Sequence, residues 1–158
     1  MPGTHPDDAQ FTRLIDLALA EAALALGHGD IPVGAVIASL DGTVIASRHN
    51  EREKLQDPTA HAELLALRDA ATTRGTWRLD NCVLAVTLEP CPMCAGAIWA
   101  ARIPLVVFGA ADPKAGAAGT LYNFAADPRL NHSTDVVRGV RDEECAALLT
   151  DFFTTRRA

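Results

Sequence analysis

Two short motifs supply the side-chain types that bind zinc. His61-Ala62-Glu63 and Pro90-Cys91-Pro92-Met93-Cys94 each stand where a helix is expected to begin. An imidazole and two thiolates form a nitrogen and sulfur donor set that suits zinc, and three protein ligands leave one coordination position open, as in catalytic zinc sites. A helix N-terminus also lowers the pKa of a nearby thiol, which favours the thiolate. His61, Cys91 and Cys94 are therefore the candidate zinc ligands.

Glu63 is the candidate catalytic residue beside this site. An open zinc position activates a water molecule by bringing its pKa down to about 7, and a carboxylate can then carry protons between that water and a substrate. Residues two apart on an ideal helix point about 200° away from each other. If His61 and Glu63 share the first turn of a helix, we expect that turn to be distorted.

The two cysteines could instead belong to a structural zinc site or to a redox-active pair, but the sequence fits both less well. A structural zinc site needs a fourth protein ligand, and the remaining histidines show no zinc-finger spacing. A redox-active Cys-x-x-Cys pair would leave His61 and Glu63 without a role. The combination of H-x-E with P-C-x-x-C is the signature of zinc-dependent nucleobase deaminases, and the proton-transfer mechanism follows from that signature, not from spacing alone.

Alternating helices and strands are predicted around these motifs. Apolar residues at helical spacing predict a helix over residues 8–27, and Asp41-Gly42 predicts a hairpin between strands 33–39 and 43–47. Thr59 is expected to cap a helix over residues 60–73, and Pro92 suits the first position of a helix ending near Ala101. The remaining expectations are strands at 82–87, 105–109 and 135–140, loops at 48–58 and 112–131, and a last helix from 142 to about 156.

This order of elements predicts an α/β fold, a three-layer α/β/α sandwich with a central mixed sheet. The length of 158 residues fits one domain, which we place at residues 8–157. Residues 1–7 are polar and are expected to form a disordered tail. There is no repeat and no linker that would divide the chain.

Composition narrows the partners and the compartment. The formal net charge of −6 predicts no binding to polyanions, so an RNA contact would need a locally basic face. No signal peptide and no membrane span is recognised, which predicts a cytoplasmic protein without membrane contact. In that compartment Cys82 and Cys145, which stand in apolar runs, are expected to be buried free thiols.

Beyond the zinc motifs, the sequence resembles the bacterial tRNA-specific adenosine deaminases, which belong to the cytidine deaminase-like superfamily. The resemblance spans roughly residues 10–157. Three features separate this family from other deaminases: the run Lys114 to Gly119, the pair Asn131-His132, and the ending Asp151-Phe152-Phe153. The other matching segments are residues 31–36, 57–63, 87–97, 106–110 and 144–149.

The resemblance implies a function and further site residues. It implies hydrolytic deamination of adenosine to inosine at the wobble position of a tRNA, an arginine tRNA in this family, by a homodimer with one zinc ion per subunit. It also implies contacts with the anticodon loop from side chains matching the family pattern. These side chains are Asn50, Asp112, Lys114, His132 and Phe153.

Each implied contact has an ordinary structural alternative. Asn50 could be a turn residue, Asp112 and Lys114 a solvated loop, Phe153 a core residue, and His132 a structural one. For the whole protein, two other functions stay open. One is a free-base guanine or cytosine deaminase, because Pro92 is shared with guanine deaminases. The other is a zinc-stabilised RNA-binding module without catalysis, although a structural zinc would have no use for Glu63.

Overall fold

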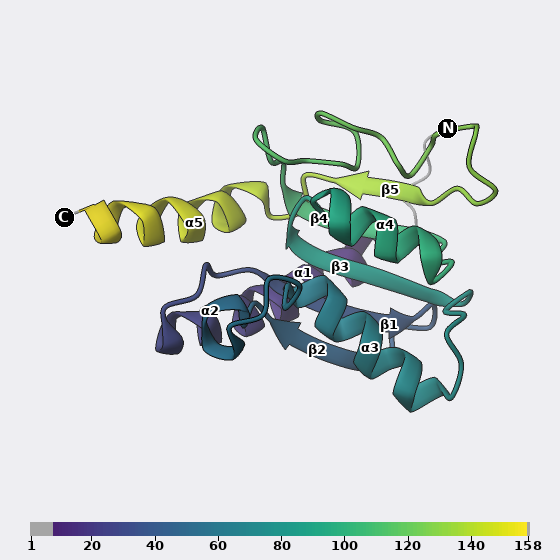
Figure 1. The fold of residues 1–158 in the computed structure, drawn as a ribbon, viewed down its shortest axis with the longest axis horizontal. Helices are drawn as coiled ribbons and strands as arrows, with labels where there is room; N and C mark the ends of the chain where they lie inside the picture. Colours follow the sequence, from purple (N-terminus) through teal and green to yellow (C-terminus); the bar gives the residue numbers. More distant parts are fainter. Residues whose placement is uncertain (1–7, 158) are drawn as a thin grey trace.

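The computed structural model describes residues 8–157, so the expected tail at residues 1–7 lies outside the described residues. Helices and strands alternate along most of the chain (Figure 1). The elements are α1 (Asp8–Leu24), the 3-10 helix η1 (Ala25–His28), β1 (Gly34–Ser39), β2 (Val44–His49), α2 (Arg52–Leu55), α3 (Ala62–Arg74), β3 (Cys82–Leu88), α4 (Pro92–Ala100), β4 (Leu105–Ala110), β5 (Asp135–Arg138) and α5 (Asp142–Arg157).

The five described strands form one mixed sheet in the order β2-β1-β3-β4-β5. β1 pairs antiparallel with both β2 and β3. β3, β4 and β5 are parallel to one another, with Val83 opposite Leu105 and Val106 opposite Val136. The parallel strands therefore end at one edge of the sheet, and the segment that leaves β3 there leads directly to Cys91.

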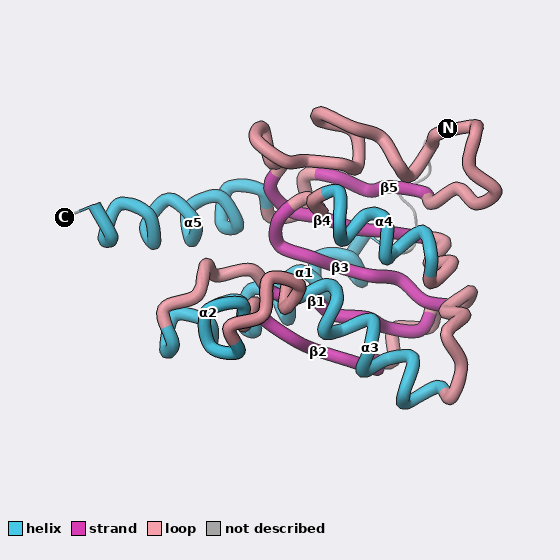
Figure 2. The backbone as a smooth tube through the Cα atoms, in the orientation of Figure 1, coloured by secondary structure: helices cyan, strands magenta, loops and turns pink. Residues whose placement is uncertain are grey.

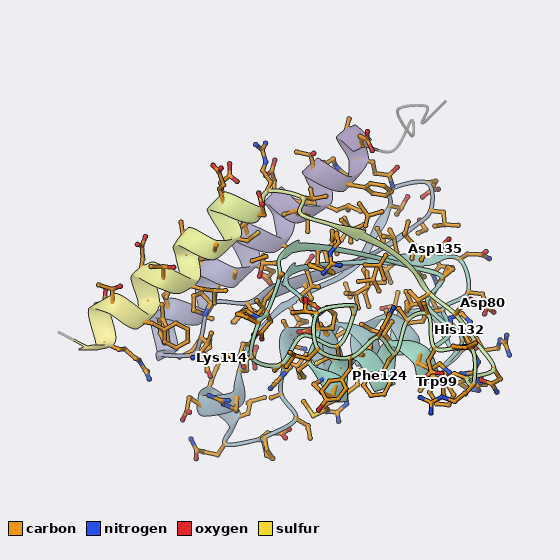
Figure 3. The ribbon with its side chains drawn as sticks, turned by 90° about the horizontal axis from the view of Figure 1, so that it is seen from above. Asp80, Trp99, Lys114, Phe124, His132 and Asp135 are labelled. Carbon is orange, nitrogen blue, oxygen red and sulfur yellow. The ribbon has the colours of Figure 1, made fainter. Side chains whose placement is uncertain are left out.

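Helices cover both faces of the sheet, which confirms the three-layer α/β/α prediction. Alternate residues of β3 point to opposite faces. Leu84 and Val86 pack with the buried residues of α3 and α4, whereas Val83 and Ala85 pack with α1 and with Cys145 of α5. Viewed from above, α1 and α5 lie side by side on one face (Figure 3).

Close packing of α1 on the sheet depends on Gly34. A Cβ atom at this position would lie 2.0 Å from the carbonyl oxygen of Ala18, which no side chain could tolerate without a backbone shift. Gly34 therefore lets the start of β1 approach the helix backbone directly.

The structure corrects two local predictions in the segment before α3. Residues 52–55, expected as loop, form the short helix α2. The predicted cap at Thr59 is wrong: its hydroxyl donates to Asp57 Oδ1 at 2.7 Å, and α3 begins at Ala62 with His61 as its N-cap residue. Asp57 competes for the hydroxyl because serine, threonine and aspartate side chains bond readily within a turn.

Residues 111–134 contain no helix and no strand of the main sheet, in agreement with the predicted loop (Figure 2). They form the crossover between the parallel strands β4 and β5, with one isolated bridge between Ala118 and Asn123. None of the helices in the described part of the chain combines the length and the hydropathy needed to cross a membrane.

Candidate metal centre and pocket

The candidate metal ligands lie at the N-termini of two helices. His61 is the N-cap residue of α3 and Cys91 is the N-cap residue of α4, and both have extended backbone angles. Pro92 occupies the first position of α4, where its fixed φ suits the helix and its missing N–H costs nothing. Cys94 lies one turn further along α4, so the two sulfurs share one end of the helix.

The distances among these side chains fit a zinc ion. His61 Nδ1 lies 3.7 Å from Cys91 Sγ and 3.5 Å from Cys94 Sγ, and the three ligand atoms lie within 4.8 Å of one another. Zinc bonds of about 2.0–2.3 Å in a tetrahedron place neighbouring ligand atoms roughly 3.3–3.8 Å apart. The cluster is therefore suited to zinc in both chemistry and spacing.

The two thiols differ in their affinity for a proton. A hydrogen bond from the Cys94 thiol and another from His61 lower the pKa of Cys91 to about 4, although burial opposes this. The same bond to Cys91, together with burial, raises the pKa of Cys94. The hydrogen bond to Cys91 also raises the pKa of His61. Cys91 is thus a thiolate at neutral pH, ready to act as a ligand.

Glu63 is buried at the same place, with 4% of its surface exposed. It is the second residue of α3, whereas His61 precedes the helix with a ψ of 151°. The expected distortion of the first turn is therefore absent, because the angle of 200° applies only when both residues are helical. Burial raises the pKa of Glu63 above its ordinary value, which suits a group that must both accept and donate a proton.

A cavity of about 160 Å³ opens beside these residues. Its walls include three of the predicted site residues, Glu63, Asn50 and Asp112, together with two of the metal-binding side chains, His61 and Cys91. The other lining residues are Ile31, Val33, Arg52, Ala62, Leu88, Glu89 and Ala115. Segments distant in sequence therefore enclose one small space beside the metal cluster.

Asn50 forms part of one wall and is buried. Its Nδ2 donates to the Ile31 carbonyl at 3.2 Å, and its Oδ1 accepts from the Arg52 backbone N–H at 3.0 Å. Since an amide group carries two donor hydrogens, these bonds orient the side chain and leave one hydrogen for a ligand.

Asp112 forms part of the facing loop. Its Oδ1 accepts from the backbone N–H groups of Lys114 and Ala115 at 2.9 and 3.2 Å. Lys114 itself is exposed and is not among the residues that line the cavity.

The two remaining predicted contacts lie elsewhere. His132 Nε2 lies 3.0 Å from the carbonyl oxygen of Ile103, and Figure 3 shows His132 well apart from Lys114. Phe153 is 43% exposed on α5 and packs edge-to-face against Phe152, with ring centroids 5.3 Å apart. The structure brings neither residue to the cavity.

Two buried carboxylates near the cavity had no place in the sequence prediction. Glu89, 2% exposed, lies in the cavity wall. Asp30, fully buried, accepts from the backbone N–H groups of Glu53 and Lys54 at 2.6 and 3.1 Å and so holds α2. An isolated carboxylate at the end of an apolar run, as at Leu88-Glu89, is the sequence signal that could have drawn attention to Glu89.

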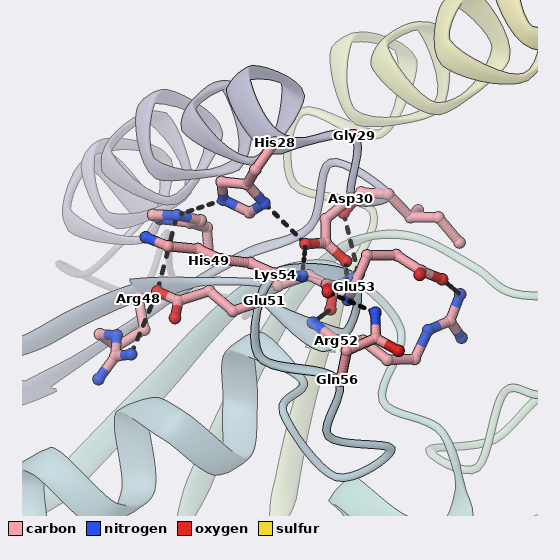
Figure 4. Close-up of polar contacts among 12 residues, drawn as sticks. His28, Gly29, Asp30, Arg48, His49, Glu51, Arg52, Glu53, Lys54 and Gln56 are labelled. Atoms are coloured by element: carbon pink, nitrogen blue, oxygen red, sulfur yellow. Dashed lines mark hydrogen bonds and ion pairs between the residues drawn. The ribbon is translucent and has the colours of Figure 1, made fainter.

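A polar network surrounds Asp30 (Figure 4). His28 Nδ1 lies 2.7 Å from Asp30 Oδ2, and its Nε2 lies 3.1 Å from His49 Nε2. Arg48 forms an ion pair with Glu51, with 3.2 Å between Nη2 and Oε1. Burial opposes ionisation of Asp30, but the hydrogen bonds from Glu53, Lys54 and His28 together hold its pKa below the ordinary value.

A mixed sheet between helices, with a histidine and two cysteines at two helix N-termini and a buried glutamate beside them, defines a zinc-dependent deaminase of the cytidine deaminase-like fold. Comparison with known proteins supports this assignment to the zinc-dependent deaminases. Residues 8–110 match the family model described as the cytidine and deoxycytidylate deaminase zinc-binding region.

Individual relatives narrow this class. A tRNA-specific adenosine deaminase of Bacillus subtilis is 49% identical over 140 residues, which cover 89% of this chain and 86% of that protein. A structure solved in work on A-to-I editing by tRNA deaminases at the wobble position is 44% identical, with a TM-score of 0.83 over 87% of this chain and 99% of that one. Guanine deaminase of Bacillus subtilis is 33% identical, with a TM-score of 0.61 over 92% and 93% of the two chains. The chain belongs to the family of tRNA-specific adenosine deaminases.

Proposed function

We propose that residues 8–157 form one deaminase domain that converts adenosine to inosine in tRNA, at the wobble position of an arginine tRNA. The single observation that carries the proposal is the cavity in which His61, Cys91 and Glu63 meet Asn50 and Asp112. Hydrolytic deamination of a nucleobase needs a metal site, a proton carrier and a pocket for one base at the same place. The relatives at 49% and 44% identity supply the substrate class.

His61, Cys91 and Cys94 would hold the zinc ion. When bound, zinc supplies Lewis acidity that makes a water molecule a good nucleophile at neutral pH. Three protein ligands are consistent with a catalytic site, since structural zinc sites generally use four.

Glu63 would move the protons of the reaction. As water adds to C6 of the adenine ring, the carboxylate takes a proton from that water and gives it to the ring nitrogen N1. It then takes the second proton from the new C6 hydroxyl and gives it to the amino group, so that the C6–N bond breaks, ammonia leaves and C6 becomes the carbonyl of inosine. Enclosure of Glu63 raises its pKa toward the working pH, and a general acid–base is most effective with a pKa near that pH.

Asn50 and Asp112 would orient the nucleoside from facing walls. The free amide hydrogen of Asn50 can be donated to the base, and the free oxygen of Asp112 can accept from a ribose 2′-hydroxyl, the group that distinguishes RNA from DNA. Lys114 would neutralise a phosphate just outside the cavity. Phe153 and His132 would act only where a larger RNA extends past the cavity, on α5 and at the far edge of the sheet.

An anticodon loop suits this site because its bases are already single-stranded. A base from such a loop can enter the cavity at an unstacking cost of only a few kcal/mol, without melting a duplex. A short contact of this kind is also compatible with a net charge of −6. The protein would act in the cytoplasm, and its four cysteines are free, as expected in a reducing compartment.

A homodimer would bury the apolar surface between α3 and α4. Trp77 is 59% exposed there, whereas Trp99 is only partly exposed. Arg102 packs over both rings, at 5.8 and 5.0 Å. The surface also includes Leu64, Leu67, Ala71, Ala97, Ala100 and Ala101. Light scattering at micromolar concentration should report a dimer, and a monomer alone would contradict this part of the proposal.

The test of the function is incubation of the zinc-loaded protein with total bacterial tRNA, followed by sequencing for A-to-I changes. We expect one modified wobble adenosine, in an arginine tRNA. Release of ammonia from free guanine or cytosine, with tRNA unchanged, would instead favour the free-base alternative. Binding of zinc and tRNA without any product would identify a non-catalytic module.

A further inference from the structure

The wall that contains Asp112 and Ala115 belongs to the loop 111–134, which has no helix or strand of the main sheet to hold it in place. Long irregular loops are usually mobile, yet a substrate wall must keep its distance from the reacting atoms. The buried contacts of this loop therefore show how its position is fixed.

Glu89 accepts four hydrogen bonds from this loop. Its Oε1 accepts from the backbone N–H of Asp112 at 3.1 Å and from the hydroxyl of Thr120. Its Oε2 accepts from the backbone N–H groups of Ala118 and Thr120 at 3.0 and 3.1 Å. One buried carboxylate thus satisfies three main-chain donors and one side-chain donor of the same loop.

The loop also closes tightly over this carboxylate. A Cβ atom at Gly116 would lie 2.5 Å from Glu89 Cδ and 2.6 Å from Oε1, so only glycine allows the backbone to come this near. Arg138 of β5 provides a nearby positive charge: its Nη2 lies 3.9 Å from Glu89 Oε1 and 3.3 Å from the Thr120 hydroxyl.

Glu89 also connects the loop to the metal cluster, because it stands two residues before Cys91. Its own backbone N–H donates to the Ala110 carbonyl at 2.8 Å, and the next residue, Pro90, accepts from the Ala117 N–H at 2.9 Å. The segment that carries a metal-binding sulfur therefore carries the anchor of the facing wall as well.

We propose that Glu89 is a positioning residue: its carboxylate sets the distance between the metal cluster and the wall that contains Asp112 and Ala115. The inference rests on the proposed function in one respect, that the wall meets the target nucleoside. It assigns no chemistry to Glu89. The effect passes through the backbone of Asp112, whose side chain then orients Ala115.

Glutamine at position 89 would fill nearly the same volume as glutamate but would accept fewer hydrogen bonds. The substitution therefore tests whether the hydrogen bonds, and not the volume of the side chain, hold the loop in place. Its amide has one acceptor oxygen, and its nitrogen would face backbone N–H groups as a second donor. At least one of the donors at Asp112, Ala118 and Thr120 would lose its partner inside the protein. The loop should then shift or open, although the volume of the side chain is nearly unchanged.

The experiment compares Glu89→Gln with Thr134→Val in the zinc-loaded protein, on an anticodon stem-loop substrate. Thr134 is the matched control because it is also buried and donates to a carbonyl, that of Ile103, at the far edge of the sheet. We expect Glu89→Gln to keep its zinc and lower kcat/KM by about 100-fold, mainly through a higher KM, since misplacement by about 1 Å can cost that much. Thr134→Val should leave KM unchanged.

Amide hydrogen exchange in the RNA-free proteins gives an independent readout. In Glu89→Gln the amides of Asp112, Ala118 and Thr120 should exchange faster, while those of β3 stay protected. Arg138→Met should raise KM modestly in the wild type and add little in the Glu89→Gln background, because both act on the same anchor.

Three outcomes would overturn the inference. The first is unchanged exchange at the three amides, the second an unchanged KM, and the third a loss of activity fully explained by lost zinc or a smaller folded fraction. If the wild-type protein failed to deaminate tRNA at all, the proposed function would fall. The exchange data would still decide whether Glu89 fixes the loop.

Discussion

The metal cluster and the wall of loop 111–134 face the same cavity but are built in different ways. His61 and Cys91 each stand at the N-cap of a helix, so the local backbone of α3 and α4 sets their direction. Asp112 has no such element behind it and depends on the carboxylate of Glu89, 23 positions away in the chain. The proposed catalytic residues thus stand on regular structure, whereas the proposed substrate contact, Asp112, stands on a loop with a buried anchor.

This difference predicts that substitutions in the two regions will affect different steps, the reaction in one case and substrate binding in the other. A change in the metal cluster should abolish the reaction without disturbing RNA binding. A change in the wall should weaken binding of the nucleoside and leave the metal in place. The following predictions test that division, from the largest expected effect to the smallest.

Glu63→Ala should reduce inosine formation to near background. General acid–base catalysis typically contributes about 10²–10⁴-fold, and because one residue would serve each proton transfer, the loss should reach the upper end or beyond. Zinc content and tRNA affinity should stay close to wild type, because Glu63 is neither a proposed ligand nor a phosphate contact. Zinc content, tRNA affinity and inosine formation should be measured on one preparation of the variant. Loss of zinc would identify Glu63 as a ligand, and retained activity would assign the proton transfers to another residue.

Cys91→Ser should lose most of its zinc, and its activity with it, because a neutral hydroxyl is a poor substitute for a thiolate ligand. Elemental analysis should give close to one zinc per chain for the wild type and much less for the variant. Cys82→Ser is the matched control, since Cys82 is buried in β3 away from the cluster. Full zinc retention in Cys91→Ser would mean that the ligand set is wrong.

On the wall side, a stem-loop with a single 2′-deoxyadenosine at the target should react about ten times more slowly than its all-ribose equivalent, since one hydrogen bond to a charged group contributes about 1.5 kcal/mol. Asp112→Asn should reduce the difference between the two substrates. Equal turnover of both by the wild type would show that Asp112 does not read the 2′-hydroxyl.

Asp30→Asn tests the support of α2, which carries the lining residue Arg52, and should change the stability of the fold more than the activity. An amide oxygen cannot replace both carboxylate oxygens that accept from Glu53 and Lys54, so we expect a loss of about 1–3 kcal/mol in the free energy of unfolding at pH 7. The folded pKa of Asp30 lies below 3.8. Its contribution is therefore complete above that pH and is lost as the pH falls through the folded pKa. Denaturant titrations at pH 7 and pH 3 should show the difference between wild type and variant narrowing at the lower pH; a constant difference would refute the assignment.

Much of the metal side could be predicted from the sequence because its information is local. The ligands and Glu63 stand in two short motifs, and helix-start signals such as Pro92 place them at helix ends. The error at Thr59 was also local: the Asp57 carboxylate took the hydroxyl that would have capped α3. That shift put His61 outside the helix and removed the apparent conflict with Glu63.

The walls could not be predicted in the same way, because a buried carboxylate acts through donors that are distant in sequence. Glu89 meets Ala118 and Thr120 only after β4 and the loop have folded back over it. Asp30 meets α2 after the hairpin of β1 and β2 has formed. His132 shows the converse: the family pattern singled it out, but its position at the far edge of the sheet depends on where β5 begins.

The route of loop 111–134 has a consequence for redesign. Glu89 anchors the loop as far as Thr120, and Thr134 fastens its end to Ile103 just before β5. Just beyond Thr120 the loop still bonds to the wall segment, because Asn123 bridges Ala118 and the Phe124 N–H donates to the Ala117 carbonyl. Residues 126–133 line none of the cavity. Each doubling of loop length costs only about 0.6 kcal/mol of closure entropy. Segments of different length grafted between Ala125 and Thr134 should therefore alter which RNA is accommodated while the reaction centre is inherited unchanged.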